Sequence, residues 1–240
     1  MNEVTLSLTY QSHGVLHSAE NEVEAFGGHL VGARHILYGL TVASDSVAAS
    51  VLKEFGIDTK LVRQALTRLD KSVVRTTRVF RFDSDAAELL CEAEKECLKL
   101  GDQFIGPEHL LLGFLNLGEK VEKFCQELVL DRVKVRARVY EFLGPKAMIA
   151  HPETLVGKTI VSTIRRSEDG EEAITATATV VSCIHNREET ILLIEMQHAV
   201  KWCRGHGDAL ERYMFAVREG NLTFLPEKGE AYPATLETIL

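Results

Sequence analysis

The chain has 240 residues, 45% of them apolar, and its 27 basic and 35 acidic residues give a formal net charge of −8. Neither half carries the basic surplus of a nucleic-acid-binding protein, and no stretch approaches the roughly 20 consecutive apolar residues that a membrane helix needs. The five cysteines include no CxxC pair and the first residues lack an export signal, so we expect a cytoplasmic protein that binds neither nucleic acid nor membrane.

A pattern of short helices occurs twice in the first part of the chain. Segments 12–26 ("SHGVLHSAENEVEAF") and 85–100 ("DAAELLCEAEKECLKL") both have amphipathic helical spacing. Each is followed by a related phrase, "VGARHILYGL" at 31–40 and "IGPEHLLLGF" at 105–114, so the offset is 74 residues. The residues shared at this offset are Gly27 and Gly101, Gly32 and Gly106, His35 and His109, Leu37 and Leu111, and Gly39 and Gly113.

Two further helices complete each unit. "VAASVLKEFGI" (47–57) and "VEKFCQELVL" (121–130) occupy the same place, and a last helical stretch ends near Leu69 in the first unit and near Leu143 in the second. A repeat of this kind indicates one helical unit used twice. The pattern therefore predicts an all-helical domain with pseudo-twofold symmetry, built from two four-helix repeats.

The boundaries follow from where the helical pattern stops. We place the helical domain at residues 1–147, with repeats at about 6–70 and 80–144. The stretch between them, "KSVVRTTRVFRF" (71–82), alternates in polarity and predicts an extended linker.

The repeated phrase contains a charge reversal at the start of a helix. Gly32 and Gly106 stand where a helix begins, and Pro107 suits its first turn because a missing N–H costs nothing there. Glu108 near the positive end of the helix dipole is stabilised by about 0.3 to 1 kcal/mol, whereas Arg34 in the matching position is disfavoured by a similar amount. Two interpretations stay open: drift at an exposed position, or a changed binding specificity.

The phrases "VGARHILYGL" and "IGPEHLLLGF" resemble the G-T-E-H-I-L-L-G-L signature of the double-repeat N-terminal domain of the Clp/Hsp100 ATPases, most of all the ClpC group. The resemblance spans residues 6–145 and does not reach residues 150–240. It implies an all-helical pseudo-twofold domain that docks adaptor and substrate proteins for a protease machine, and we expect protein or peptide partners, with Clp ATPase or protease subunits among the candidates.

The resemblance also suggests binding residues. In some ClpC-like domains the Glu of the signature and a Thr at the start of the first helix of the same repeat receive phosphoarginine. Carried over repeat by repeat, the first repeat has Thr9 with Arg34 and the second has Asp83 with Glu108. Aspartate repels phosphate and arginine repels guanidinium, so we expect no phosphoarginine binding. If Arg34 marks a changed specificity, the first repeat should prefer an acidic partner and the second a basic one.

The stretch "LVGKT" (155–159) looks like the end of a phosphate-binding loop. Pro152 stands where the first Gly of such a loop belongs, and "IVSTIRRS" (160–167) predicts a strand where the loop must open a helix. Too few residues follow Thr159 for a ring ATPase module. We therefore expect no ATP site and a recognition domain without its motor.

Residues 152–240 have the alternating pattern of β structure. "EEAITATATVVSCI" (171–184) predicts a half-buried strand, and "ETILLIEM" (189–196) predicts a second. "RYMFAV" (212–217) and "LTFLP" (222–226) predict a hairpin. We expect a small antiparallel sheet or barrel, with the stretch 198–211 as a short helix or a long loop across its edge.

This half offers only weak candidates for chemistry. His198, Cys203 and His206 are suitable zinc ligands, but their spacing matches no tight metal-binding pair, and no nucleophile stands beside an identifiable base. We therefore predict a multidomain α+β protein without catalytic residues, metal or cofactor, which acts as an adaptor or regulator of a Clp chaperone or protease. The alternative is an enzyme or ligand sensor whose activity lies in the β domain, with the repeats as scaffold.

Overall fold

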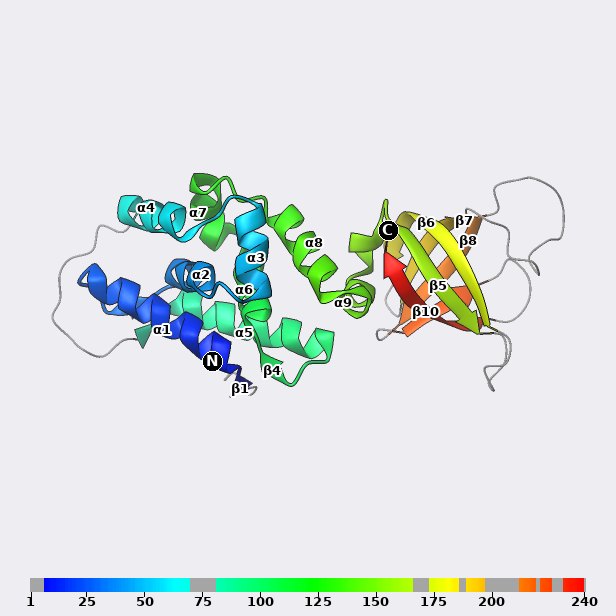
Figure 1. Ribbon diagram of the computed structural model, residues 1–240, viewed down its shortest axis with the longest axis horizontal. Coiled ribbons are helices and arrows are strands. Elements are labelled where there is room, and N and C mark those ends of the chain that lie inside the picture. Colours follow the sequence, from blue (N-terminus) through cyan, green and yellow to red (C-terminus); the bar gives the residue numbers. More distant parts are fainter. Residues whose placement is uncertain are drawn as a thin grey trace. The chain divides into compact units, whose positions relative to one another are not determined.

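The computed structural model (Figure 1) describes residues 7–69, 81–165, 173–185, 189–196, 212–218, 221–225 and 231–239. The chain divides into two compact units between Phe142 and Leu143. The first unit is helical and the second contains a closed antiparallel barrel, which confirms the predicted α+β architecture.

Each predicted repeat supplies four α-helices to the helical unit. The first repeat contains α1 (Tyr10–Ala25), α2 (Ala33–Val42), α3 (Val47–Glu54) and α4 (Thr59–Leu69). The second contains α5 (Ser84–Leu100), α6 (Pro107–Asn116), the 3-10 helix η1 (Gly118–Val121), α7 (Glu122–Glu127) and α8 (Arg132–Leu143). The helical periodicity of the sequence therefore predicted these elements correctly.

The Gly that closes each repeated phrase lets two helices approach closely. A Cβ on Gly39 of α2 would lie 2.2 Å from the backbone oxygen of Val15 on α1. A Cβ on Gly113 of α6 would lie 2.5 Å from the backbone oxygen of Leu89 on α5. Any side chain at these positions would push the paired helices apart, so both repeats need glycine here.

The repeated His is explained by the helix start. The backbone N–H of Gly32 donates to Nδ1 of His35 at 3.0 Å, and that of Gly106 donates to Nδ1 of His109 at 2.9 Å. The imidazole thus plays the part that Glu or Gln plays at the third position of a capping box. The phrase G-x-x-H is therefore a helix-start motif in both repeats.

Two helices end in the same left-handed turn with different residues. After α3, the N–H of Ile57 donates to the carbonyl of Leu52 at 2.8 Å, with Gly56 at φ +74°. After α7, the N–H of Leu130 donates to the carbonyl of Cys125 at 2.8 Å, with Val129 at φ +54°. This is the Schellman arrangement, in which the left-handed position is normally glycine.

Two pairs of two-residue parallel strands join the repeats. Strand β1 (Ser7–Leu8) pairs with β4 (Phe104–Ile105), and β2 (Leu30–Val31) pairs with β3 (Arg81–Phe82). Of the predicted extended linker at 71–82, only Arg81 and Phe82 belong to the described residues, and both are extended.

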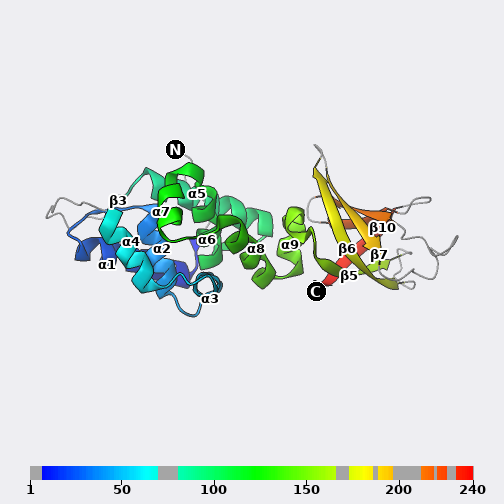
Figure 2. The same cartoon turned by 90° about the horizontal axis from the view of Figure 1, so that it is seen from above.

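The second unit begins with α9 (Pro145–Ala150) and the 3-10 helix η2 (Pro152–Leu155), which precede the barrel (Figures 1 and 2). Neighbouring strands follow the closed order β10-β5-β6-β7-β8-β9. The strands are β5 (Thr159–Arg165), β6 (Ala173–His185), β7 (Thr190–Met196), β8 (Arg212–Arg218), β9 (Asn221–Leu225) and β10 (Tyr232–Ile239).

The barrel interior follows the alternation seen in the sequence. Ala176, Ala178 and Val180 of β6 are buried, and a register shift between Val180 and Ser182 then changes the face that the strand presents. The predicted hairpin is present, because Arg218 of β8 pairs with Asn221 of β9. The barrel confirms the predicted antiparallel β structure and adds β10, which the sequence pattern had not indicated.

The phosphate-loop resemblance at 155–159 coincides with a turn before a strand. Gly157 has φ +81°, and its N–H donates to the carbonyl of Val180 at 2.8 Å. Lys158 follows this turn and β5 begins at Thr159, so the predicted strand is confirmed at this place. A phosphate-binding loop opens a helix instead.

Among the described residues, no single helix is long and apolar enough to cross a membrane. Helices α2 and α3 together have the length and apolar composition of a membrane-spanning segment, but the chain bends by 94° between them.

Candidate functional site

Each of the two short parallel strand pairs, which we call ladders, joins a strand of one repeat to a strand of the other. The N–H of Thr9 donates to the carbonyl of Ile105 at 3.0 Å, and the hydroxyl of Ser12 donates to the same carbonyl at 2.7 Å. In the matching ladder, the N–H of Asp83 donates to the carbonyl of Val31 at 3.0 Å. The start of α1 therefore lies beside the start of α6, and the start of α5 beside the start of α2.

This crossing corrects the assignment of the candidate residues. The pairs expected from the sequence, Thr9 with Arg34 and Asp83 with Glu108, were taken within each repeat, and the structure does not bring them together in that way. The ladders instead place Thr9 beside the stretch that leads to Glu108, and Asp83 beside the stretch that leads to Arg34. The reason is that β1 and β3 each pair with the strand of the other repeat.

We call the first group, Thr9, Asp102 and Glu108, the acidic site. Thr9 caps α1, and its hydroxyl oxygen accepts from the N–H of Ser12 at 3.1 Å. Glu108 stands in the first turn of α6, and its Oε1 lies 3.4 Å from Nδ1 of His109. Asp102 Oδ2 lies 3.2 Å from Nε2 of the same imidazole, which is only 1% exposed. A buried ring thus separates two carboxylates, of which Asp102 is half exposed and Glu108 about one-fifth.

Asp102 is a site residue that the sequence analysis missed. It lies in the turn between Gly101 and β4, where helical or strand periodicity gives no signal. A signal was nevertheless present in the repeat, because the residue matching Asp102 at the offset of 74 is Gly28. Only the second repeat therefore supplies this second carboxylate.

We call Arg34 and Asp83 the mixed-charge site. Asp83 caps α5 and accepts from the N–H of Ala86 at 2.8 Å. Its carboxylate also lies against the start of α2, since a Cβ on Gly32 would be 2.6 Å from Asp83 Oδ2. Arg34 is the second residue of α2 and is half-buried. One carboxylate and one guanidinium thus stand here, where the acidic site has two carboxylates.

The acidic site affects a neighbouring thiol. Burial, followed by the charges of Asp102 and Glu108, raises the pKa of Cys97 to about 11, and its Sγ lies 3.4 Å from the backbone oxygen of Asp102. A thiol with this pKa is protonated at neutral pH and makes a poor nucleophile. Cys97 therefore offers no reactive thiol beside the acidic site.

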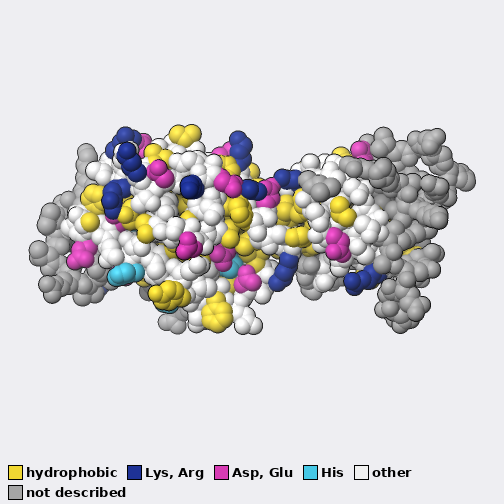
Figure 3. All heavy atoms as spheres, in the orientation of Figure 1, with side chains coloured by type: hydrophobic (Ala, Val, Ile, Leu, Met, Phe, Trp, Pro, Cys, Tyr) yellow, Lys and Arg dark blue, Asp and Glu magenta, His cyan; other side chains and the backbone are white. Residues whose placement is uncertain are grey.

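Exposed hydrophobic side chains border the acidic site. Tyr10 follows Thr9 and is 92% exposed, and Phe104 of β4 is 53% exposed. Figure 3 shows hydrophobic side chains at the surface over the start of α1 and over β4. Exposed aromatic residues beside charged groups are typical of protein-binding surfaces.

The candidate zinc ligands His198, Cys203 and His206, on which a metal site in the β domain would depend, lie outside the described residues. Within the described ranges, no group of three or more His, Cys, Asp and Glu is placed to hold a metal ion. Cys183 and His185 of β6 do lie together, with Sγ 3.7 Å from Nε2. Burial raises the pKa of the Cys183 thiol, which opposes its use as a nucleophile.

Comparison with known proteins agrees with the helical fold. Residues 7–128, just over half of the chain, match the family model described as the Clp repeat (R) N-terminal domain. The chain therefore belongs to this family, which confirms the resemblance seen in the repeated phrases.

The relatives are Clp ATPase subunits and chaperones. The ATP-dependent Clp protease ATP-binding subunit ClpA homolog of Guillardia theta is 33% identical over 141 residues, which are 57% of this chain and 17% of the relative. The chloroplastic chaperone protein ClpC of Pisum sativum is 33% identical over 138 residues, which are 55% of this chain and 15% of the relative. The chain thus spans less than one-fifth of the length of these relatives.

Among solved structures, the N-terminal domain of the caseinolytic protease associated chaperone ClpD from Arabidopsis thaliana covers 60% of this chain and 99% of its own, with a TM-score of 0.47 and 15% identity. The Hsp104 N-terminal domain from Candida albicans covers 57% of this chain and 92% of its own, with a TM-score of 0.49 and 15% identity.

Proposed function

We propose that the helical domain is a protein-binding module that recognises substrate or adaptor proteins for a Clp chaperone or protease, and that the chain acts as an adaptor or regulator in that system. The names of its relatives, which include ATP-binding subunits of a Clp protease and ClpC chaperones, support this role. In this chain a β barrel follows the helical domain.

The observation that carries the proposal is the acidic site. Asp102 and Glu108 place two carboxylates around one buried imidazole. Carboxylates bind a guanidinium through charge-assisted hydrogen bonds. We infer that the acidic site receives an arginine side chain of the partner.

The mixed-charge site should bind an arginine side chain less well than the acidic site. Arg34 adds a guanidinium where the acidic site has Glu108, and Gly28 replaces Asp102. A second arginine would meet a like charge there. The domain therefore presents one arginine site, although its fold contains two matching places.

A peptide titration tests this proposal. The probe is acetyl-Gly-Gly-Arg-Gly-Gly-amide, with citrulline in place of arginine as a neutral control, and binding to the full chain is followed by amide NMR shifts at low salt. Replacing Glu108→Gln removes a partly buried charge-assisted contact worth about 1 to 2 kcal/mol, which corresponds to an affinity loss of about 5- to 30-fold.

Arg34→Gln is the matched control, since it occupies the same position in the other repeat and should leave the affinity for the arginine peptide unchanged. Equal affinity for the arginine and citrulline peptides would exclude arginine recognition. A phosphoarginine peptide adds a further comparison: tighter binding than arginine would assign the phosphate to the N–H groups at the start of α1.

A further inference from the structure

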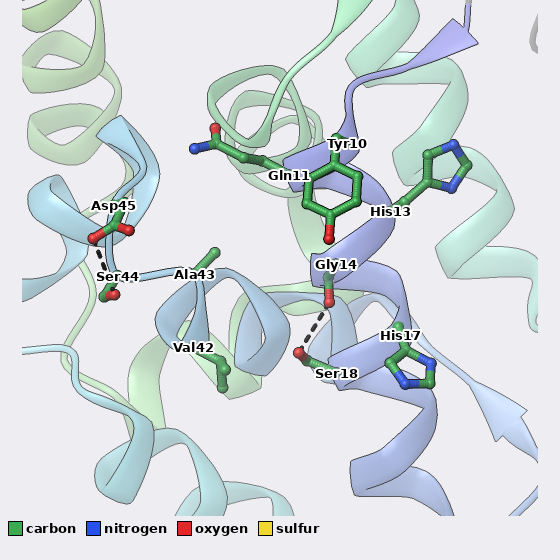
Figure 4. A pocket seen from close by; sticks show the side chains of 10 residues that line it. All are labelled: Tyr10, Gln11, His13, Gly14, His17, Ser18, Val42, Ala43, Ser44 and Asp45. Atoms are coloured by element: carbon green, nitrogen blue, oxygen red, sulfur yellow. Dashed lines mark hydrogen bonds between the residues drawn. The ribbon is translucent and has the colours of Figure 1, made fainter.

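A cavity lined by residues that follow Thr9 lies between α1 and the turn that joins α2 to α3 (Figure 4). Its volume is about 510 Å³. Tyr10 and Gly14 line it from α1, and Val42 and Asp45 line it from the opposite side. We call it the Gly14 pocket.

Glycine at position 14 leaves the floor of this pocket open. Gly14 lies within α1 on an exposed face, and outside its chain neighbours and its own helix backbone no heavy atom of the described residues lies within 4 Å of the place where its Cβ would be. Glycine inside a helix is less stable than alanine, and here no close approach of another segment requires it. The consequence of this residue is space beside the exposed ring of Tyr10.

The second repeat shows what fills the same place there. The residues that match Gly14 and Gln11 at the offset of 74 are Glu88 and Asp85 on α5. Both carboxylates face Lys120 of η1: its Nζ forms an ion pair with Glu88 and lies 3.9 Å from Asp85 Oδ1. An ammonium group thus spans the gap between helix and turn in the second repeat, and the first repeat has Ser46 at the position of that lysine.

The charges around the Gly14 pocket also favour a cation. Asp45 supplies an exposed carboxylate, and the C-terminal end of α2 adds the negative end of a helix dipole. The ring of Tyr10 offers its face to a cation. The imidazoles of His13 and His17, which also line the pocket, provide acceptor nitrogens in their neutral form.

We propose that the Gly14 pocket is a second subsite for a basic side chain of the same partner segment that occupies the acidic site. The inference rests on the proposed function, because it assigns the second contact of that partner. Thr9 and Gly14 are separated by about 7.5 Å along the axis of α1 at 1.5 Å per residue. Three residues of a partner in the polyproline II conformation rise about 9 Å and complete one turn, so basic residues at positions i and i+3 point to the same side and reach both places.

Two peptides test the subsite on the full chain. One is acetyl-Gly-Arg-Gly-Gly-Arg-Gly-amide, and the other carries citrulline in place of the second arginine. Statistics alone give the double-arginine peptide an advantage of about twofold, because either arginine can enter one site. Two subsites raise that advantage to about fivefold or more at low salt, and salt reduces it.

Gly14→Leu fills the pocket and should reduce the advantage of the double-arginine peptide to the statistical value. Gly14→Ala is the matched control: it removes the glycine without filling the space, so the advantage should remain. Both changes favour the helix, and loss of binding in Gly14→Leu is therefore not a folding defect. Asp45→Asn should weaken the double-arginine peptide, whereas Glu119→Gln at the matching position of the second repeat should not.

The outcomes separate this inference from the proposed function. An advantage that survives in Gly14→Leu, or that never exceeds the statistical value in the unaltered protein, overturns the subsite. If Glu108→Gln leaves both peptides unaffected while Gly14→Leu weakens the double-arginine peptide, the pocket binds a basic side chain and the acidic site does not.

Discussion

The two Schellman turns predict a reciprocal pair of stability changes. Val129 occupies a left-handed position at φ +54° and is 88% exposed, so its side chain gains little by burial. A left-handed conformation costs an L-residue about 1 to 2 kcal/mol, and Val129→Gly relieves this cost. Glycine also gives the unfolded chain more freedom, which costs about 0.5 to 1 kcal/mol. We expect Val129→Gly to raise the free energy of unfolding of the helical unit by about 0.5 to 1 kcal/mol.

The first repeat supplies the reverse experiment. Gly56 holds the same position at φ +74°, and apart from its chain neighbours no heavy atom of the described residues lies within 4 Å of its Cβ position. Gly56→Val therefore introduces the strain without a steric clash, and should lower the free energy of unfolding by a similar amount. The double variant should return close to the stability of the unaltered protein, because the two turns lie in different repeats.

Urea unfolding followed by the helical circular dichroism signal measures these changes, since the helical unit dominates that signal. The slope of each transition should stay constant, because neither substitution changes the buried surface much. Destabilisation by Val129→Gly would refute the reasoning, and would mean that the exposed valine makes a stabilising contact in the folded state.

Two further predictions concern charged side chains. The carboxylate of Glu22 is 2% exposed and accepts a hydrogen bond from Arg63 Nε at 2.7 Å. Arg63→Met should destabilise the helical unit by about 2 kcal/mol. This value is below the usual cost of breaking a buried ion pair because the Arg63 side chain is half exposed. Arg68→Met, which breaks the exposed pair with Glu127, should cost about 0.5 kcal/mol or less in the same urea assay, and equal losses would contradict this. In the second unit, a hydrogen bond with His151 lowers the pKa of Glu153. A carboxylate whose pKa is lower in the folded state stabilises that state at pH values above its unfolded pKa, and this stabilisation is lost as the pH falls through the folded pKa. Acidification below about pH 4.5 should therefore destabilise the barrel less in Glu153→Gln than in the unaltered protein. The amide NMR signals of the barrel strands measure this difference.

The sequence predicted the helical domain well because two independent signals agreed. Helical periodicity appears twice, and the glycines recur where helices touch, as Gly39 and Gly113 show. The barrel strands were predicted from alternation, except β10. That strand contains Pro233, which pairs with Thr223 of β9 but lies before the part of β10 that pairs with β5. Proline usually argues against a strand that has neighbours on both sides.

The site could be predicted only in part. Thr9, Asp83 and Glu108 were identified as residues at helix starts, and the structure places them there. Their pairing could not be read from the sequence, because it depends on two ladders of two residues each, too short to leave a periodic pattern. Asp102 was missed for a related reason, since a turn residue has no period to reveal it.

Because each ladder joins the two repeats, neither repeat alone contains all the residues of either site. The acidic site takes Thr9 from one half of the chain and Glu108 from the other, while Asp83 and Arg34 form the converse combination. In a symmetric dimer of a single repeat the two sites would necessarily be identical, because every substitution would appear in both subunits. Covalent linkage of the halves removes that restriction: a change at position 34 alters one site and leaves the other intact, so the two places are free to acquire different ligands within an unchanged scaffold.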